Sequence, residues 1–594
     1  MFHLKKLLCT AALLMATAAF AQTYDLPIMF IDTDHRCLNY DVIQKIPATI
    51  KVLDGKTNNV ADSSKGTQYN IGIKVRGRTS AEYPKPNYTI EFHDATGKDT
   101  NVSLLGLPPS DDWVLHGPYV DKSMIRNSFG HWLFRQTGRY SPRTKFFDLY
   151  INGVYRGVYE LTERIKRDKY RVNVSELKET DAVGENLTGG YIWEFDRKFN
   201  RRGAGEVIDY TTRDFKTSNG HNVVLLYPRK KKITNEQKEY IQNYLSELDS
   251  LYKGDKSGSG YEKYVDIVSA ADYLLHLELT NNMDPYLANN FFMYKSKDET
   301  DEQGNKTVGK INLGPPWDFE IILCNDYHPE NYEINSDDSA FFATITNCYV
   351  EGWEINRVYK NTGLGGVQPI KWLLEMWKDS IFQIEMKKRW AELRSGVWHT
   401  KTMDTYLDSM KTSLTSAAER NFKRWPNLGK VSGAHDEDPF PMKYCNTIRT
   451  QWAGMAMGGF NADTWDGEFE HVRKKVKERI AWMDEQLGFT EPANPVVFEP
   501  IIHEPDWRAE MGDTSSLHIH SDDFSRLSPT NYFVVIGKRL EIHTSVGGTF
   551  ALVDLNGAVL YRTRIKTGVT TLAVPTNARN KHWIATLNGK MMNR

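Results

Sequence analysis

The sequence predicts an α+β protein with two lobes, a sheet-rich N-terminal lobe followed by a helical lobe, and a small β-sandwich at the C-terminus. Three observations predict this arrangement. Apolar residues alternate with period two in the first third, follow helical periodicity from about residue 234, and return to short strands after a proline-rich stretch. The 594 residues are 40% hydrophobic and 25% charged, which is ordinary for globular proteins and sufficient for more than one core.

A signal peptide is expected over residues 1–21. Two lysines precede an apolar run over residues 7–20, and Ala19-Phe20-Ala21 is a small-x-small cleavage site. No later segment offers about 20 unbroken apolar residues, so we expect no transmembrane segment. The sequence therefore predicts a protein that is secreted or held at the cell surface.

Four cysteines remain after this cleavage, Cys37, Cys324, Cys348 and Cys445. They contain no CxxC pair, so a structural zinc site is not expected. An exported protein can carry one or two disulfides, and Cys324 with Cys348 is a candidate pair. Four unpaired or buried thiols are an equally open alternative.

The overall charge gives no sign of a nucleic-acid partner. The net charge is −1 and the pI is about 7.0, so the chain lacks the positive field that attracts nucleic acid. Local basic runs over residues 164–171 and 229–232 are interpreted as solvated faces.

Period-two patterns mark the strands of the first lobe, for example over residues 71–75 and 88–92. The apolar runs before and after Asn152-Gly153 predict a hairpin, because these two residues tolerate the positive φ that a tight turn needs. One helix interrupts the strands. Its apolar residues between 125 and 133 share a face, and Ser123 is the expected N-cap.

From residue 234 the apolar pattern becomes helical. Thr234 and Gln237 form a capping box at the start of the first helix. Residues 291–294 and 309–313 interrupt the helices as a small hairpin with a polar loop between its strands. Further helices are expected at about 264–279, 369–394, 401–424 and 468–487.

Prolines between residues 492 and 505 indicate a linker. The expected domains are 22–490, with lobes of about 22–232 and 233–490, a linker at 491–525 and a β-sandwich at 526–594. Six strands are expected in the last part, at 533–536, 540–543, 549–554, 559–565, 570–574 and 583–587.

Two acidic residues stand where phosphoryl-transfer chemistry needs them. Asp284 follows a predicted helix, Asn289 lies five residues later, and Asp318 follows the small hairpin. Phosphoryl transfer uses one carboxylate to orient the attacking hydroxyl, and a second carboxylate with an amide oxygen to hold Mg²⁺. The spacing alone is weak evidence, because Asp284 and Asp318 could also be helix and turn caps.

A basic turn in the first lobe could bind phosphate. The strand that ends at Val75 runs into RGRTSAEYPK, in which Gly77 permits close approach of the backbone, and Arg76 and Lys85 supply donors. The turn contains no GxGxxG motif. A decorated hairpin loop is the alternative interpretation.

Together, these segments resemble the CotH (spore coat protein H) kinase family. The resemblance covers about residues 26–490 and is carried by LPIMFIDT, IGIKVRGRTSAEYPKPNYTIEF, ELTNNMDPYLANN, GPPWDFEI, SAAERNFKRWPNLG and RIAWMDEQL. It implies an atypical, bilobal protein-kinase-like fold that binds ATP with Mg²⁺ or Mn²⁺. It also implies phosphorylation of Ser or Thr hydroxyls of exported or surface proteins. Transfer of AMP in the same cleft stays open.

The resemblance assigns roles within the helical lobe. Asp284 looks like the catalytic aspartate and Asp318 like the metal-binding aspartate, with Asn289 as a second metal ligand. The HRD triplet of protein kinases is replaced by Asn282-Met283-Asp284.

Cofactor-binding roles are implied in the sheet-rich lobe. Arg76 and Gly77 match the family's RG turn, and Lys85 matches the first lysine of its PKK-like motif and would contact phosphate. Glu163 matches a family glutamate that would lie at the nucleotide edge or pair with a lysine. Pro86 replaces the second lysine of the motif, so a catalytically inactive pseudokinase that acts as a surface-binding or structural protein is the alternative function.

The C-terminal part resembles the sorting domain of the type IX secretion system. The segment FALVDLNGAVLYRTRI carries this resemblance. It implies outer-membrane secretion machinery as a partner. An ordinary small adhesive β-domain is the alternative interpretation.

Overall fold

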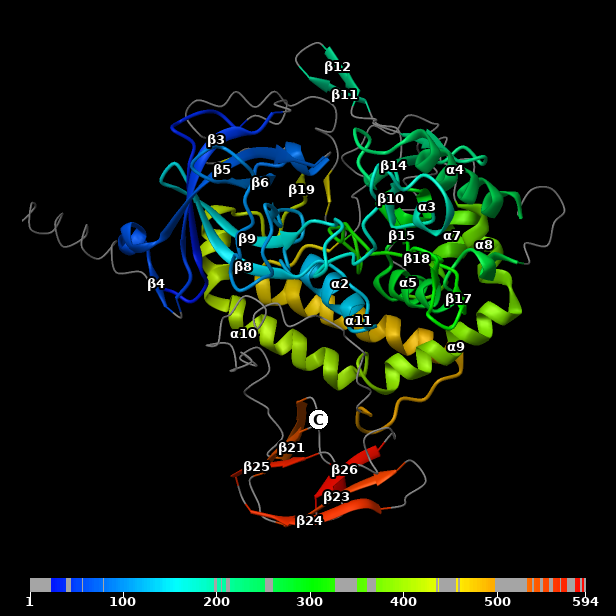
Figure 1. Ribbon diagram of the computed structural model, residues 1–594. Coiled ribbons are helices and arrows are strands. Elements are labelled where there is room, and N and C mark those ends of the chain that lie inside the picture. Colours follow the sequence, from blue (N-terminus) through cyan, green and yellow to red (C-terminus); the bar gives the residue numbers. More distant parts are fainter. Residues whose placement is uncertain are drawn as a thin grey trace, which may run out of the picture. The chain divides into compact units, whose positions relative to one another are not determined.

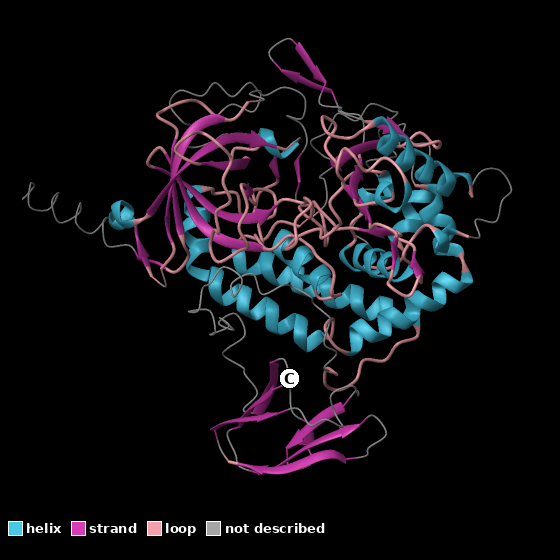
Figure 2. Ribbon diagram, viewed as in Figure 1, coloured by secondary structure: helices cyan, strands magenta, loops and turns pink. Residues whose placement is uncertain are grey.

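The protein is described here from a computed structural model, and it is an α+β protein (Figures 1 and 2). Two compact units, Met1–Pro505 and Asp506–Arg594, divide the chain inside the expected linker. The signal peptide expected at 1–21 lies outside the described residues. The structure describes residues 23–38, 44–55, 57–77, 79–196, 200–203, 206–209, 214–251, 260–325, 350–360, 370–433, 436, 438, 456–457 and 460–496, and the strands between 531 and 591.

Seven strands of the first unit close into a barrel, in the order β2-β3-β5-β6-β7-β9-β8. Closure depends on β2, which pairs in parallel with β8 so that Ile28 lies opposite Asp148. The interior is apolar, and Ile73, Ile90 and Trp113 are fully buried in it. The strands are β2 (Ile28–Asp32), β3 (Ile46–Leu53), β5 (Thr67–Arg76), β6 (Asn87–His93), β7 (Asp112–His116), β8 (Thr144–Ile151) and β9 (Val154–Glu163).

Local signals in the barrel gave one correct prediction and one wrong prediction. The β8–β9 hairpin is confirmed, since Asn152 and Gly153 have φ of 50° and 78° at its turn. The helix α2 (Arg126–Arg135) is not capped by Ser123. Instead, Oδ2 of Asp121 accepts the backbone N–H of Arg126 at 2.9 Å, because the chain before the helix folds back on itself.

A second sheet follows the barrel, in the order β13-β14-β10-β15-β18. Its strands come from both expected lobes, because β10, β13 and β14 lie before the expected boundary at residue 232 and β15 and β18 lie after it. The expected hairpin is confirmed, because β15 pairs antiparallel with β18. The strands are β13 (Phe215–Lys216), β14 (Asn222–Tyr227), β10 (Tyr191–Phe195), β15 (Phe291–Lys295) and β18 (Ile311–Leu313).

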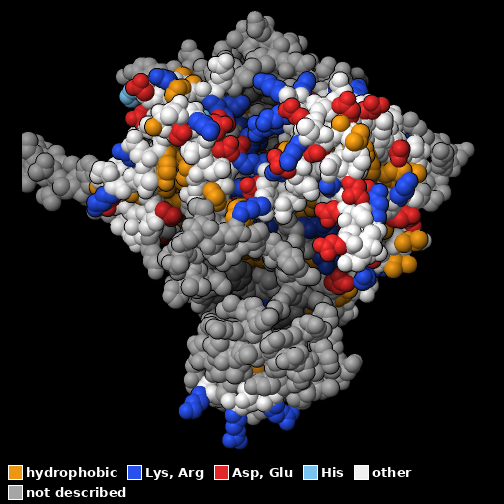
Figure 3. Space-filling view, in the orientation of Figure 1, with side chains coloured by type: hydrophobic (Ala, Val, Ile, Leu, Met, Phe, Trp, Pro, Cys, Tyr) orange, Lys and Arg blue, Asp and Glu red, His pale blue; other side chains and the backbone are white. Residues whose placement is uncertain are grey.

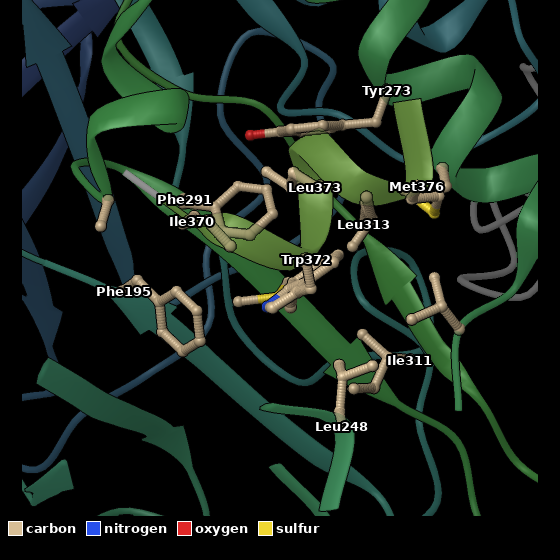
Figure 4. Close-up of a cluster of buried hydrophobic side chains, with 14 of the residues drawn as sticks. Phe195, Leu248, Tyr273, Phe291, Ile311, Leu313, Ile370, Trp372, Leu373 and Met376 are labelled. Carbon is tan, nitrogen blue, oxygen red and sulfur yellow. The ribbon is translucent and has the colours of Figure 1, made fainter. Parts of the chain in front are cut away.

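Helices pack an apolar core against this second sheet. Figure 4 shows Phe291 of β15 and Leu313 of β18 beside Tyr273 of α5 (Ile267–Thr280) and Trp372 of α8 (Lys371–Lys378). The helix α4 (Asn235–Ser250) starts at the predicted capping box, which is confirmed.

The long helix expected at 369–394 is two helices, α8 and α9 (Ser380–Ser395). The break lies at Asp379, whose Oδ1 accepts the N–H of Ile381 at 2.9 Å and so starts the second helix. The helices α10 (Thr400–Arg424) and α11 (Trp465–Leu487) run along the barrel and the other helices (Figure 1). Among the described helices, none is both long and apolar enough to cross a membrane.

The second unit consists of two antiparallel sheets, β21-β22-β25 and β24-β23-β26-β27. Ile542 in the first sheet and Phe550 in the second are fully buried. The six expected strands are confirmed as β21 (Asn531–Ile536), β22 (Arg539–Thr544), β23 (Gly548–Asp554), β24 (Val559–Ile565), β25 (Gly568–Ala573) and β26 (Trp583–Leu587), and β27 (Lys590–Met591) is additional.

Cys37 and Cys324 are each disulfide-bonded. The alternative of four unpaired thiols is therefore wrong. The proposed partner Cys348 and the remaining Cys445 lie outside the described residues.

Candidate functional site

The chain turns sharply between α5 and β15, and this turn carries Asp284. The helix ends at Asn281 in the left-handed conformation, and Asp284–Leu287 form one 3₁₀ turn. Ala288 and Asn290 also have positive φ, of 52° and 53°. Non-glycine residues rarely adopt this conformation, and such residues often occur at functional sites.

The two predicted aspartates are each held by one of two consecutive asparagines. Nδ2 of Asn289 donates to Oδ2 of Asp284 at 2.8 Å, and Nδ2 of Asn290 donates to Oδ2 of Asp318 at 3.0 Å. Asn282 also donates to the backbone carbonyl of Asp318, at 3.3 Å. The structure therefore brings together Asp284, Asn289 and Asp318, and it adds Asn290 as the partner of Asp318.

Phe319 fixes the segment that carries Asp318. Its side chain is fully buried, and its ring centroid lies 4.8 Å from that of His131. Gly130 of α2 makes room for it, since a Cβ at this position would lie 2.6 Å from the Phe319 ring. This packing fixes the chain next to Asp318, which follows β18 and has a φ of 66°.

Arg76, at the end of β5, faces this acidic group. Its guanidinium lies over the ring of Trp317 at 5.3 Å and interacts electrostatically with Asp318 and Glu194. Burial and the neighbouring Arg164 lower the pKa of Arg76 to about 10, so it is still charged at neutral pH. Its guanidinium makes no hydrogen bond or ion pair with the residues that the structure describes, so its donors are available to a ligand.

Gly77 gives the chain its turn beside Arg76. Its φ is 111°, which favours glycine, and a Cβ here would lie 2.2 Å from Oγ of Ser80. The close approach of the chain expected at Gly77 is therefore present.

Further basic side chains lie close to Arg76. The pKa of Lys74 is lowered by burial and by Lys45, Arg164 and Arg76. Figure 3 shows Lys and Arg side chains gathered in the hollow between the barrel and the second sheet. This concentration of positive charge suits an anionic ligand.

Lys85 is buried below the surface instead of facing this hollow. Its side-chain nitrogen donates to Oδ1 of Asn421 at 2.9 Å and to the carbonyl of Pro118 at 3.3 Å, and it lies 5.2 Å from the ring centroid of Tyr159. Only 1% of the residue is exposed. Burial holds its pKa well below the usual range. A phosphate contact by Lys85 stays a prediction, and these contacts give it a structural role.

Glu163 is fully buried and pairs with arginines, so the prediction of a lysine partner is wrong. Oε2 of Glu163 accepts Nε of Arg143 at 3.0 Å, and Nη2 of Arg171 lies 3.1 Å from Oε1. Tyr140 donates to the same carboxylate at 3.4 Å. A position at the nucleotide edge stays a prediction.

The sequence interpretation missed His116 and Glu320. Nδ1 of His116 lies 3.7 Å from Oε1 of Glu320, and both side chains are 10% exposed. Burial lowers the pKa of His116 to about 3, so this imidazole is neutral. Burial, with Asp318 as the next cause, raises the pKa of Glu320. In the sequence, Glu320 stands where protein kinases have the glycine of Asp-Phe-Gly, and this difference could have drawn attention to it.

The donor set around Asp318 fits a divalent cation. Carboxylate and amide oxygens are the ligands that Mg²⁺ and Mn²⁺ prefer. A separate group on the barrel, Glu91, His93 and Asp99, has ligand atoms within 4.8 Å of one another. Lys45 already occupies that group, with its ammonium 2.6 Å from Glu91.

Comparison with known proteins places these features in a family. Residues 73–483 match the family described as CotH kinase protein. The inner spore coat protein H of Bacillus subtilis (strain 168) is 24% identical over 315 residues, which cover 53% of this chain and 73% of that protein. The family match spans most of the barrel, the second sheet and the long helices, including Asp284 and Asp318. The chain belongs to the CotH kinase family.

Proposed function

We propose that this protein is an exported atypical kinase that transfers phosphate from ATP to Ser or Thr hydroxyls of exported or surface proteins. One observation carries the proposal: Asp284 and Asp318 are held by consecutive asparagines on one turn. Family membership implies ATP use and kinase activity. The protein substrate and the export are proposals that rest on the sequence.

Asp284 is the proposed catalytic base. Asn289 orients its carboxylate, which would accept the proton of the attacking hydroxyl. Asp318 is the proposed metal ligand. Because the nitrogens of Asn289 and Asn290 hold the aspartates, their amide oxygens are the atoms that would face a cation. Bound there, Mg²⁺ or Mn²⁺ would neutralise charge on the phosphates.

Arg76 is the best-placed phosphate contact. Its donors are available, it lies beside Asp318, and Gly77 lets the backbone turn close to it. Lys74 and Arg164 add positive charge to the same surface. A planar guanidinium suits phosphate oxygens because it can donate two parallel hydrogen bonds.

The first test is calorimetric titration of the full chain with Mg-ATP and Mn-ATP. We expect metal-dependent binding that Asp318→Asn abolishes, whereas Asp301→Asn in an exposed loop leaves it unchanged. A folded wild-type protein that binds neither complex would overturn the proposal. That result would favour the alternative of an inactive pseudokinase that acts as a surface-binding protein.

The reaction products decide which group is transferred. Phosphate transfer to a hydroxyl releases ADP, whereas AMP transfer releases pyrophosphate. We expect ADP, and we expect Asp284→Asn to keep ATP binding while transfer falls roughly 10²–10⁴-fold. Release of pyrophosphate would show that the protein transfers AMP instead of phosphate.

The export part of the proposal concerns the two ends of the chain. Residues 1–21 would direct secretion, and residues 526–594 would engage outer-membrane secretion machinery. Cell fractionation of the producing bacterium, with and without residues 526–594, tests both. Retention of the complete chain inside the cell would contradict the proposal.

A further inference from the structure

Glu320 is a buried carboxylate whose hydrogen bonds are incomplete. Its Oε1 has no hydrogen-bond partner among the described residues, and neither has Nε2 of His116 beside it. The 3.7 Å between Nδ1 of His116 and Oε1 is too long for a hydrogen bond. Buried polar atoms are nearly always paired, and a carboxylate is among the most costly to leave unpaired. A ligand that binds Oε1 would remove this cost.

Glu320 lies close enough to Asp318 for their charges to interact. Phe319 between them is anchored in the core below. Asp318 is the charged neighbour that acts most strongly on Glu320, and Asp121 is the next. Asn87 holds the carboxylate from the barrel side. Two ionised carboxylates in such proximity repel each other, and either a proton or a bound cation relieves this repulsion.

Arg76 is a protein cation that acts on both Asp318 and Glu320. Arg76 interacts with Asp318, Glu320 and Glu194, so one positive charge faces three carboxylates. The nearby Arg164 is already committed to Asp112, at 2.7 Å. A divalent cation would add positive charge here and prefers carboxylate oxygen ligands.

We infer that Glu320 is a second carboxylate ligand of the divalent cation at Asp318. The inference rests on the proposed function, since it concerns the same cation. It adds a ligand that lies beside His116 of β7.

Mn²⁺ binding in the absence of nucleotide tests the inference. The full chain is titrated with Mn²⁺ and free ion is followed by electron paramagnetic resonance, in a His93→Ala background that removes the second cluster of potential ligands. We expect Glu320→Gln to weaken Mn²⁺ binding at least 10-fold and Asp318→Asn to weaken it similarly. Glu354→Gln, another buried carboxylate change, is the matched control and should leave the affinity unchanged.

The outcomes separate the inference from the proposed function. If Glu320→Gln binds Mn²⁺ like wild type while Asp318→Asn does not, the inference is overturned and the proposed function stands. If the folded wild type binds neither Mn²⁺ nor Mn-ATP, both are overturned. If Glu320→Gln does not fold, as judged by circular dichroism, Glu320→Asp decides. It keeps the charge but withdraws the oxygens, so an unchanged affinity would overturn the inference and a 10-fold loss would support it.

Discussion

The side-chain nitrogen of Lys85 lies 2.9 Å from Oδ1 of Asn421, a residue 336 positions further along the chain. The same oxygen accepts the backbone N–H of Val158 in β9, at 3.1 Å. One amide of α10 therefore joins two separate parts of the barrel. The lysine that the family resemblance assigns to phosphate holds the barrel and the helical region together.

Substitution of Lys85 separates these two roles. We expect Lys85→Met to change the dissociation constant for Mg-ATP less than twofold, because the amine is buried and bound to protein groups. The matched substitution Arg76→Met should weaken ATP binding at least 10-fold, because it removes a charge that faces the site. Calorimetric titration measures both. A 10-fold loss in Lys85→Met, with unchanged thermal stability, would restore the phosphate-binding role.

The contact between β9 and α10 depends on Gly157. Its φ is 95°, and a Cβ would lie 2.6 Å from Oδ1 of Asn421 and 2.8 Å from Nε1 of Trp425. We expect Gly157→Ala to lower the free energy of unfolding by roughly 2–5 kcal/mol through strain and steric overlap. Gly153→Ala is the control, since it has φ of 78° and open space around the new Cβ, and should cost about 1 kcal/mol. Urea denaturation compares the two, and equal losses would contradict the contact.

Removing the charge of Glu163 should affect stability more than function. Glu163→Gln removes one carboxylate from the buried Arg171, which keeps Asp168 at 3.2 Å, and from Arg143 beside it. We expect a loss of roughly 1–3 kcal/mol in the free energy of unfolding, because the arginines keep part of their hydrogen bonding and Arg171 keeps a countercharge. The folded fraction should bind Mg-ATP with wild-type affinity in calorimetric titration. A selective loss of ATP affinity at unchanged stability would instead place Glu163 at the nucleotide edge.

Glu160 gives the barrel a dependence on pH. Burial raises its pKa from 4.5 to about 8, so the folded protein binds this proton more tightly than the unfolded chain. The stabilisation is complete below about pH 4.5 and is lost as the pH rises through about 8. We expect Glu160→Gln to become more stable relative to wild type, by a few kcal/mol, between pH 5 and pH 9.

Urea denaturation at pH 5, 7 and 9 measures this difference for Glu160→Gln. The exposed Glu299→Gln is the control and should follow the wild type at every pH. A constant difference between Glu160→Gln and wild type from pH 5 to pH 9 would show that Glu160 is already ionised in the folded protein.

Local sequence signals predicted those elements whose cause lies within a few residues. The capping box of Thr234 and Gln237 and the turn at Asn152-Gly153 need only neighbouring residues, and both are confirmed. The helix expected at 401–424 agrees with α10 to within one residue for the same reason. Ser123 failed because Asp121, a stronger acceptor two residues earlier, captures the helix N-terminus.

Features that depend on distant segments could not be read from the sequence. Barrel closure requires β2 to meet β8, and the burial of Lys85 requires Asn421. The spacing of Asp284 and Asp318 indicated a shared site, but the pairing of Asp318 with Asn290 depends on two tight turns. Oε1 of Glu320 and Nε2 of His116 lack hydrogen-bond partners among the described residues, and this depends on segments that lie far apart in the sequence.

The position of β10 between β14 and β15 has a consequence for how the chain is made. In the folded protein, β14 pairs with one edge of β10 and β15 pairs with the other edge. Until the ribosome has synthesised β15, the backbone N–H and C=O groups on that second edge have no strand to pair with. Such an open edge can pair with foreign strands. A polypeptide that stops near residue 232 would keep this edge permanently. We therefore expect the two halves to aggregate when produced separately, and a nascent chain to need protection until Phe291–Lys295 has emerged.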